Sequence, residues 1–353
     1  MNAMPPPNSG LRQMHPAYFA LVMATGIVSI ACELKGWGGL ARALFYVNVP
    51  AYLVLWMLSI ARIVRHWRNF SADLMDHARG VGFFTTVAAT CVLGSQFLVL
   101  FQAYRAALIL WCLGVLLWAV LTYTIFTLLT VRADKPELAK GINGGWLVAV
   151  VAAQSVSILG SQLATMAGQY SEPLSFFSLV MWLGAGMLYI WIISLIFFRY
   201  TFYTMQPSEL APPYWINMGA VAISTLAGTF LIGNAEHSPL LLSLLPFLKG
   251  MTLLSWATAT WWIPMLVTLG AWRHGYRGFP LRYDPLYWGA VFPLGMYTAC
   301  TYRLSVAVEA PFLRWIPEYF VYVAVAAWGL TFIGLLHTLW NVGRSLHFTP
   351  PAR

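Results

Sequence analysis

Long runs of apolar residues fill most of this chain, and short segments between them carry the polar and charged residues. A helix needs about 20 predominantly apolar residues to cross the hydrocarbon core of a bilayer. On that criterion we predict spans at residues 16–33, 42–64, 80–101, 106–131, 145–166, 174–200, 214–234, 248–271, 286–308 and 318–340. Residues 239–273 are too many for one span, so we interpret 239–247 as an external loop or a re-entrant segment. The pattern predicts an all-α integral membrane protein with ten transmembrane helices.

The composition supports this class and excludes others. Of the 353 residues, 60% are hydrophobic and 9% are charged, whereas about a quarter of a soluble globular chain is charged. We therefore expect no soluble enzyme. The net charge of +9 comes from basic residues between the apolar runs, so it predicts topology and not a nucleic-acid partner. We expect residues 1–14 to be a disordered cytoplasmic tail without a signal peptide, 15–342 to be the membrane domain and 343–353 to be a short cytoplasmic tail.

The positions of the basic residues predict which way the chain is inserted. With the predicted spans, 14 of the 20 Lys and Arg residues fall on the side of the N-terminus. Basic residues concentrate in the cytoplasmic segments of membrane proteins. Both termini are therefore predicted in the cytoplasm, and the protein is expected to be a multi-pass protein of the plasma membrane, or of the inner membrane if the source is bacterial.

The odd-numbered spans differ from the even-numbered ones. Residues 87–90 (VAAT) and 93–96 (LGSQ) of the third span have a counterpart in 151–154 (VAAQ) and 159–162 (LGSQ) of the fifth, which indicates an internal repeat. The odd spans are also richer in Gly, Ala, Ser and Thr. We therefore predict five helical hairpins, with the odd helices forming an inner ring around a central pore and the even helices outside. Composition alone equally allows a solid bundle in which small residues only bring helices together.

Few ionisable residues lie near the middle of the spans, which disfavours ion-coupled transport. Lys249 and Arg303 are predicted near the external mouth, where they either attract anions or simply lie at the surface. Pro293 and Gly295 predict a kink in the ninth span, because proline removes a helical hydrogen bond. Phe292 beside this kink is a candidate pore gate, although most membrane phenylalanines only pack against neighbours.

Three groups of motifs resemble a known family. They are 15–19 (HPAYF) with 23–27 (MATGI), 82–85 (GFFT) with 93–96 (LGSQ), and 288–297 (WGAVFPLGMY). In order and spacing they resemble the tellurite-resistance and dicarboxylate transporter family, which includes the slow-type anion channels of plant guard cells. The resemblance runs from about Pro16 to Trp340. The long phosphorylated tails of the plant channels are absent from this sequence.

The resemblance implies a ten-helix homotrimer with one pore in each subunit and an aromatic gate on the ninth helix. Carried onto this sequence, the gate falls on Phe292. Further candidate pore-lining residues are two aromatics of the third span and three glycines of the odd spans: Phe83, Phe84, Gly26, Gly94 and Gly160. The implied ligands are small inorganic or organic anions, of the dicarboxylate, sulfite, chloride or nitrate class.

Three classes of function remain in competition. The first is passage of small anions through a gated pore, as a channel or uniporter, and the second is a proton-coupled dicarboxylate or sulfite carrier linked to tellurite resistance. A membrane enzyme would need a cluster of catalytic or metal-binding groups. The densest such group is His66, Asp73, Asp76 and His77, which we interpret as a solvated loop. The four cysteines lie in apolar runs and predict no disulfide or zinc site. We expect no metal, no cofactor and no catalytic residues.

Overall fold

The computed structural model describes residues 9–347, and every regular element within that range is helical. The ten long helices are α2 (Ala20–Leu34), α3 (Gly38–Arg65), α5 (Phe84–Phe101), α6 (Tyr104–Val131), α8 (Val148–Ala164), α9 (Ser171–Phe202), α10 (Ile216–Gly233), α12 (Leu245–Ala271), α13 (Trp288–Ala307) and α14 (Trp315–His347). Three short helices lie between them, α4 (Trp67–Leu74), α7 (Leu138–Gly141) and α11 (Pro239–Ser243), and a fourth, α1 (Ser9–Arg12), precedes α2. The predicted all-α class is confirmed.

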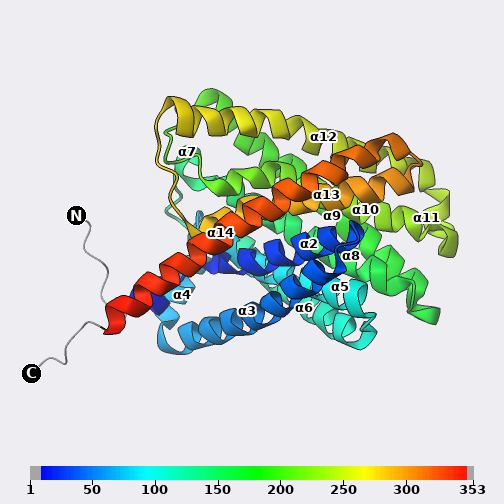
Figure 1. Ribbon diagram of the computed structural model, residues 1–353, viewed down its shortest axis with the longest axis horizontal. Coiled ribbons are helices and arrows are strands. Elements are labelled where there is room, and N and C mark those ends of the chain that lie inside the picture. The colour runs from blue at the N-terminus through cyan, green and yellow to red at the C-terminus, as the bar shows by residue number, and fades with distance from the viewer. Residues whose placement is uncertain (1–8, 348–353) are drawn as a thin grey trace, which may run out of the picture.

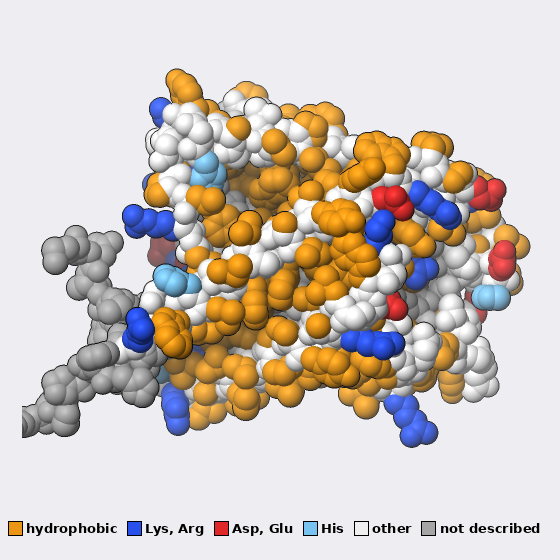
Figure 2. All heavy atoms as spheres, in the orientation of Figure 1, with side chains coloured by type: hydrophobic (Ala, Val, Ile, Leu, Met, Phe, Trp, Pro, Cys, Tyr) orange, Lys and Arg blue, Asp and Glu red, His pale blue; other side chains and the backbone are white. Residues whose placement is uncertain are grey.

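Nine of the long helices in the described range are also apolar enough to cross a membrane. The exception is α13, which carries Arg303 among tyrosines, threonines and glycines. Figure 2 shows hydrophobic side chains over the middle of one face, with charged side chains toward its two ends. This distribution fits a bilayer, whose core excludes charge and whose headgroup regions accept it.

Five helices form a closed ring inside the molecule. Along the chain α2 contacts α5, α5 contacts α8, α8 contacts α10 and α10 contacts α13, while α13 contacts α2 and closes the circle. The other five long helices lie outside, each against the ring helix that precedes it and also against the next one round. Each candidate membrane span contains an apolar stretch of 18 residues. In the four ring helices among these spans 72–100% of that stretch is buried, whereas in the outer helices only 11–39% is buried. These are the contacts that five hairpins with their first helices inward would make.

Each ring helix begins with a short turn of 3-10 helix. These turns are Pro16–Phe19, Gly80–Phe83, Gly144–Leu147, Pro212–Trp215 and Pro285–Tyr287. Proline suits such starts because its fixed φ is already helical and a first-turn N–H has no partner within the helix. Before three of the turns the side chain of His15, Asn143 or Asp284 accepts a hydrogen bond from a backbone N–H two residues later. The sequence therefore marks where the ring helices start.

Two chain ends and one connection differ from the prediction. Within the expected disordered tail, Ser9–Arg12 is helical and the Met14 side chain is 5% exposed. Helix α14 continues to His347, into the expected second tail. The remaining parts of both tails, residues 1–8 and 348–353, lie outside the described residues. The expected loop at 239–247 contains α11, and α12 then begins at Leu245. Figure 1 shows α4 and α7 at one end of the molecule and α11 at the other.

Substituting Gly144 should destabilise the ring. A Cβ at this position would lie 2.5 Å from the carbonyl oxygen of Pro213 and 2.6 Å from Cα of Tyr214, both backbone atoms that cannot rotate away. Overpacking of this kind costs about 1–3 kcal/mol. Gly144→Ala should therefore lower the melting temperature of the purified protein in detergent. Gly184→Ala is the control, because nothing lies within 4 Å of that position on α9. Equal melting temperatures for the two variants would contradict the close contact.

Candidate functional site

The five ring helices present inward-facing residues in one shared register. From each helix we take five positions separated by 3, 4, 3 and 4 residues, a spacing that keeps them on one face of a helix. They are Ala20, Met23, Ile27, Ile30 and Leu34 on α2; Thr85, Ala88, Val92, Ser95 and Val99 on α5; Val148, Val151, Ser155, Ile158 and Gln162 on α8; Ile216, Gly219, Ile223, Leu226 and Phe230 on α10; and Gly289, Phe292, Met296, Ala299 and Arg303 on α13. Equivalent positions form five successive layers.

Two cavities lie along these layers. The first layer lines a cavity at the end where the ring helices begin, which we call the wide cavity. The third, fourth and fifth layers line a second, narrow cavity further along. The centre of a water molecule can reach about 400 Å³ of the wide cavity and about 30 Å³ of the narrow one. Each cavity therefore has walls from all five ring helices, and the two share no lining residue.

The second layer separates the two cavities. It consists of Met23, Ala88, Val151, Gly219 and Phe292, and all five are buried. Ala88 and Val151 are small, and Gly219 has no side chain. Met23 is a long, flexible side chain that also lines the wide cavity, and Phe292 carries a full aromatic ring with 0% of its surface exposed. The structure thus places the predicted gate residue in the layer between the cavities.

Close contacts on both sides fix the position of Phe292. A Cβ on Gly219 would lie 2.7 Å from Cγ of Pro293, so α10 and α13 meet at the proline ring. On the other side a Cβ on Gly295 would lie 3.0 Å from Cγ2 of both Ile27 and Val28 of α2. Around a helix, position 292 lies between positions 293 and 295. Helix α13 continues through Pro293 as one element, and the proline ring is its contact surface toward α10. The kink at Pro293 and Gly295 stays a prediction.

The other predicted pore-lining residues lie away from the two cavities. The Phe83 ring lies 5.0 Å from the Phe70 ring of α4, and the Phe84 ring lies 5.8 Å from the Phe126 ring of α6. Both aromatics therefore point outward from the ring. The three glycines likewise face side chains of other helices. A Cβ added to Gly26 would lie 2.5 Å from Val92, one added to Gly94 would lie 2.5 Å from Leu159, and one added to Gly160 would lie 2.5 Å from Ser178. Their small size permits close helix contacts.

The two basic residues predicted at the mouth differ in position. Arg303 lines the narrow cavity, and its guanidinium carbon lies 5.0 Å from the centre of the Phe230 ring. Lys249 lies on α12, outside the ring, and lines neither cavity.

Three polar residues of the narrow cavity were missed by the sequence interpretation. Ser95, Ser155 and Gln162 are its hydroxyl and amide groups, and the Ser95 hydroxyl donates to Oε1 of Gln162 at 2.8 Å. The 3-4-3-4 spacing groups residues on one face of each helix, but it does not tell which face is turned inward. The residues 93–96 and 159–162, matched by sequence, are not in structural register, because Ser95 shares its layer with Ile158.

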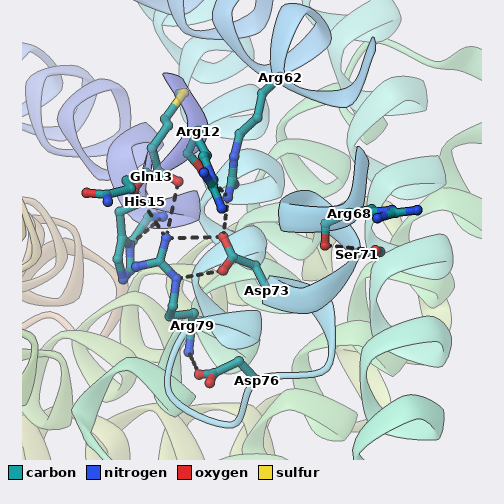
Figure 3. Close-up of polar contacts among 11 residues, drawn as sticks. Arg12, Gln13, His15, Arg62, Arg68, Ser71, Asp73, Asp76 and Arg79 are labelled. Atoms are coloured by element: carbon teal, nitrogen blue, oxygen red, sulfur yellow. Dashed lines mark hydrogen bonds and ion pairs between the residues drawn. The ribbon is translucent and has the colours of Figure 1, made fainter. Parts of the chain in front are cut away.

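An ion-pair cluster holds the chain before α2 at the edge of the wide cavity. Asp73 of α4, 9% exposed, accepts hydrogen bonds from Arg62 at 2.6 Å and Arg79 at 2.7 Å. Arg79 also donates to the Gln13 and Met14 carbonyls, and Arg62 to the Arg12 carbonyl. Figure 3 shows Asp73 between the two arginines. Asp73, interpreted above as part of a solvated loop, is instead the anion of a partly buried cluster.

His15 lies beside this cluster and lines the wide cavity. Burial, followed by the nearby positive charge of Arg79, lowers the pKa of its imidazole from 6.5 to about 4. The ring is therefore neutral near pH 7, and its Nδ1 accepts a hydrogen bond from the Ala17 N–H. His15 contributes no charge to the cavity at that pH.

Comparison with known proteins decides the family. The family model SLAC1, described as a voltage-dependent anion channel, matches residues 13–336. The chain belongs to this family. The match covers all five ring helices and both cavities, so the geometry described above is that of a SLAC1-family membrane protein.

Several relatives carry descriptive names. An uncharacterized membrane protein of Mycobacterium tuberculosis is 39% identical over 164 residues, which are 45% of this chain and 83% of the relative. An uncharacterized transporter of Methanocaldococcus jannaschii is 27% identical and covers 83% of this chain and 85% of its own. The sulfite efflux pump SSU1 of Arthroderma benhamiae is 23% identical, with 91% and 90% covered. These names, with that of the SLAC1 family, place the chain among membrane proteins of anion transport.

Removing the negative charge of the cluster should destabilise the protein. Asp73→Asn leaves Arg62 and Arg79 without a carboxylate, and breaking a buried ion pair on one side costs about 3–5 kcal/mol. Because Arg79 is partly exposed, we expect the lower end of this range. Thermal unfolding in detergent measures the change. Asp134→Asn, which removes the same charge from an exposed connection, is the control and should leave the melting temperature unchanged.

Proposed function

We propose that this protein passes small anions through the ring of five helices and that the Phe292 side chain closes the passage. The observation that carries the proposal is the position of the Phe292 side chain. It is fully buried in the layer between two cavities that are both enclosed by the same five helices. The other members of that layer are small or flexible. Rotation of one aromatic side chain would therefore connect the cavities without separating the helices.

The charges along the cavities favour anions. The wide cavity is lined by Arg79, Lys140 and Arg199, each of which forms an ion pair with a carboxylate. The narrow cavity is lined by Arg303 without an acidic residue, so the excess of positive charge lies there. In a low-dielectric surrounding an excess of one sign concentrates ions of the opposite sign. The narrow cavity otherwise offers hydroxyl and amide groups and apolar walls, which suits ions that pass without tight binding.

A channel or uniporter fits these features better than a coupled carrier. A proton-coupled dicarboxylate or sulfite carrier, with or without a link to tellurite resistance, needs a group that titrates near pH 7 in the passage. His15 is the imidazole that lines a cavity, and its pKa is lowered to about 4. The fungal relatives are named sulfite efflux pumps, so sulfite joins chloride, nitrate and dicarboxylates as a ligand to be tested.

The same proposal includes the membrane, the orientation and the assembly of the protein. The protein would lie in the plasma membrane, or in the inner membrane of a bacterium. The distribution of basic residues favours an orientation with the wide cavity at the cytoplasmic end and both termini in the cytoplasm. Large exposed apolar side chains on the outer helices suit contact with lipid or with two further copies in a homotrimer.

Shortening the Phe292 side chain should open the passage. In liposomes, Phe292→Ala is expected to raise anion flux or current at least tenfold over the parent protein, because Met23, which is flexible, is then the one large side chain left in the layer. Phe84→Ala is a matched control: Phe84 is equally buried on a ring helix, but its ring lies against Phe126 of α6. Unchanged flux in Phe292→Ala, or an equal increase in Phe84→Ala, would remove Phe292 from this role.

The pH dependence of uptake separates the channel from the carrier. Since His15 has its pKa lowered to about 4, it stays neutral from pH 6 to pH 8 and becomes protonated only as the pH falls through that value. At zero membrane potential, uptake of a strong-acid anion should therefore be equal with and without a gradient between pH 6 and pH 8. His15→Gln should behave like the parent protein in this range. Uptake driven by the proton gradient would instead support the carrier.

A further inference from the structure

The charged group at the far end of the narrow cavity has no partner of opposite charge. Arg303 makes no ion pair within residues 9–347, and the contact that the structure gives its guanidinium is the Phe230 ring at 5.0 Å. The cations of the wide cavity differ, because Arg79, Lys140 and Arg199 pair with Asp73, Glu137 and Glu209. A partly buried guanidinium without a carboxylate has lost part of its hydration without gaining an opposite charge, so an anion that reaches it binds favourably.

A second donor lies in the same layer. The Ser95 hydroxyl already occupies Oε1 of Gln162, so the amide NH₂ group of Gln162 remains free to donate. Gln162 and Arg303 come from α8 and α13, which lie on either side of α10, and Phe230 of α10 lies between them in the layer. The face of the Phe230 ring contacts the guanidinium of Arg303, which leaves the N–H groups of the guanidinium available to donate hydrogen bonds.

We infer that Arg303, Gln162 and Phe230 form a binding site for one small trigonal oxyanion. This inference rests on the proposed anion passage and specifies where in it an ion stops. A planar guanidinium matches two oxygens of an oxyanion and gives a shorter, stronger pair of hydrogen bonds than a spherical halide receives. The narrow cavity, with about 30 Å³ open to the centre of a water molecule, accepts an ion of a few heavy atoms and not an extended dicarboxylate.

The position of the site explains its use. Eleven residues of α13 separate Arg303 from Phe292, which corresponds to about 16 Å along the helix. An anion bound at Arg303 therefore waits beyond the closed layer, with only hydroxyls and apolar side chains between the two positions. Binding at this distance selects the ion before it reaches Phe292.

Binding can be measured without transport. Melting curves of the purified protein in detergent are recorded against sodium nitrate and sodium chloride, with gluconate keeping the ionic strength constant. A ligand that binds the folded state raises the melting temperature with its concentration. We expect Arg303→Gln to raise the half-maximal nitrate concentration at least tenfold and Gln162→Leu to raise it severalfold. Arg303→Lys, which keeps the charge without the planar fork, should lose the preference for nitrate over chloride.

Arg314→Gln is the matched control, because Arg314 is exposed and does not line the narrow cavity. It should leave the nitrate response unchanged. An unaltered response in both Arg303 variants, or an equal loss in Arg314→Gln, would overturn the inference. If Arg303→Gln does not fold, the nitrate-to-chloride ratio of Arg303→Lys decides. Failure of the proposed function is seen separately, as unchanged flux in Phe292→Ala liposomes.

Discussion

Close contact between the backbones of the five ring helices is the constraint on which this structure depends. In a bilayer the hydrophobic effect does not drive one apolar helix against another, so association relies on dispersion contacts and short interhelical distances. Glycines supply those distances where α10 meets α13 at Gly219 and Pro293, and where α13 meets α2 at Gly295 and Val28. Both contacts flank Phe292. The interaction that closes the ring therefore also fixes the residue proposed to close the passage.

The closed ring separates two kinds of surface. Outer helices carry large exposed hydrophobic residues, such as Trp191 on α9 and Leu330 on α14, which suit contact with lipid. Ring helices are covered on their outer sides and are free to carry polar groups. This explains why α13, with Arg303, Pro293 and several hydroxyls, is less apolar than a lipid-facing helix and still occupies the membrane domain. A helix surrounded by protein can carry a charge that a lipid-facing helix cannot.

The two ends of the ring are electrostatically different. At the wide cavity the basic residues are compensated, and Asp73 uses two arginines to hold the chain before α2 in place. In the narrow cavity Arg303 is uncompensated. Charge that is paired with protein stabilises the structure, while charge left unpaired is available to a mobile ion. The paired cations thus stabilise the structure, and Arg303 is the cation proposed to bind an ion.

The sequence by itself determined the all-α membrane class, the ten long helices and the family, because apolar run length and the motifs around Phe292 are local properties of the chain. It could not determine which small residues line the two cavities. Gly26, Gly94 and Gly160 pack against neighbouring helices, while Ser95, Ser155 and Gln162 face the narrow cavity. Which way a residue faces depends on the rotation of each helix about its axis. That rotation is set by contacts between helices far apart in the chain, so only the tertiary structure decided it.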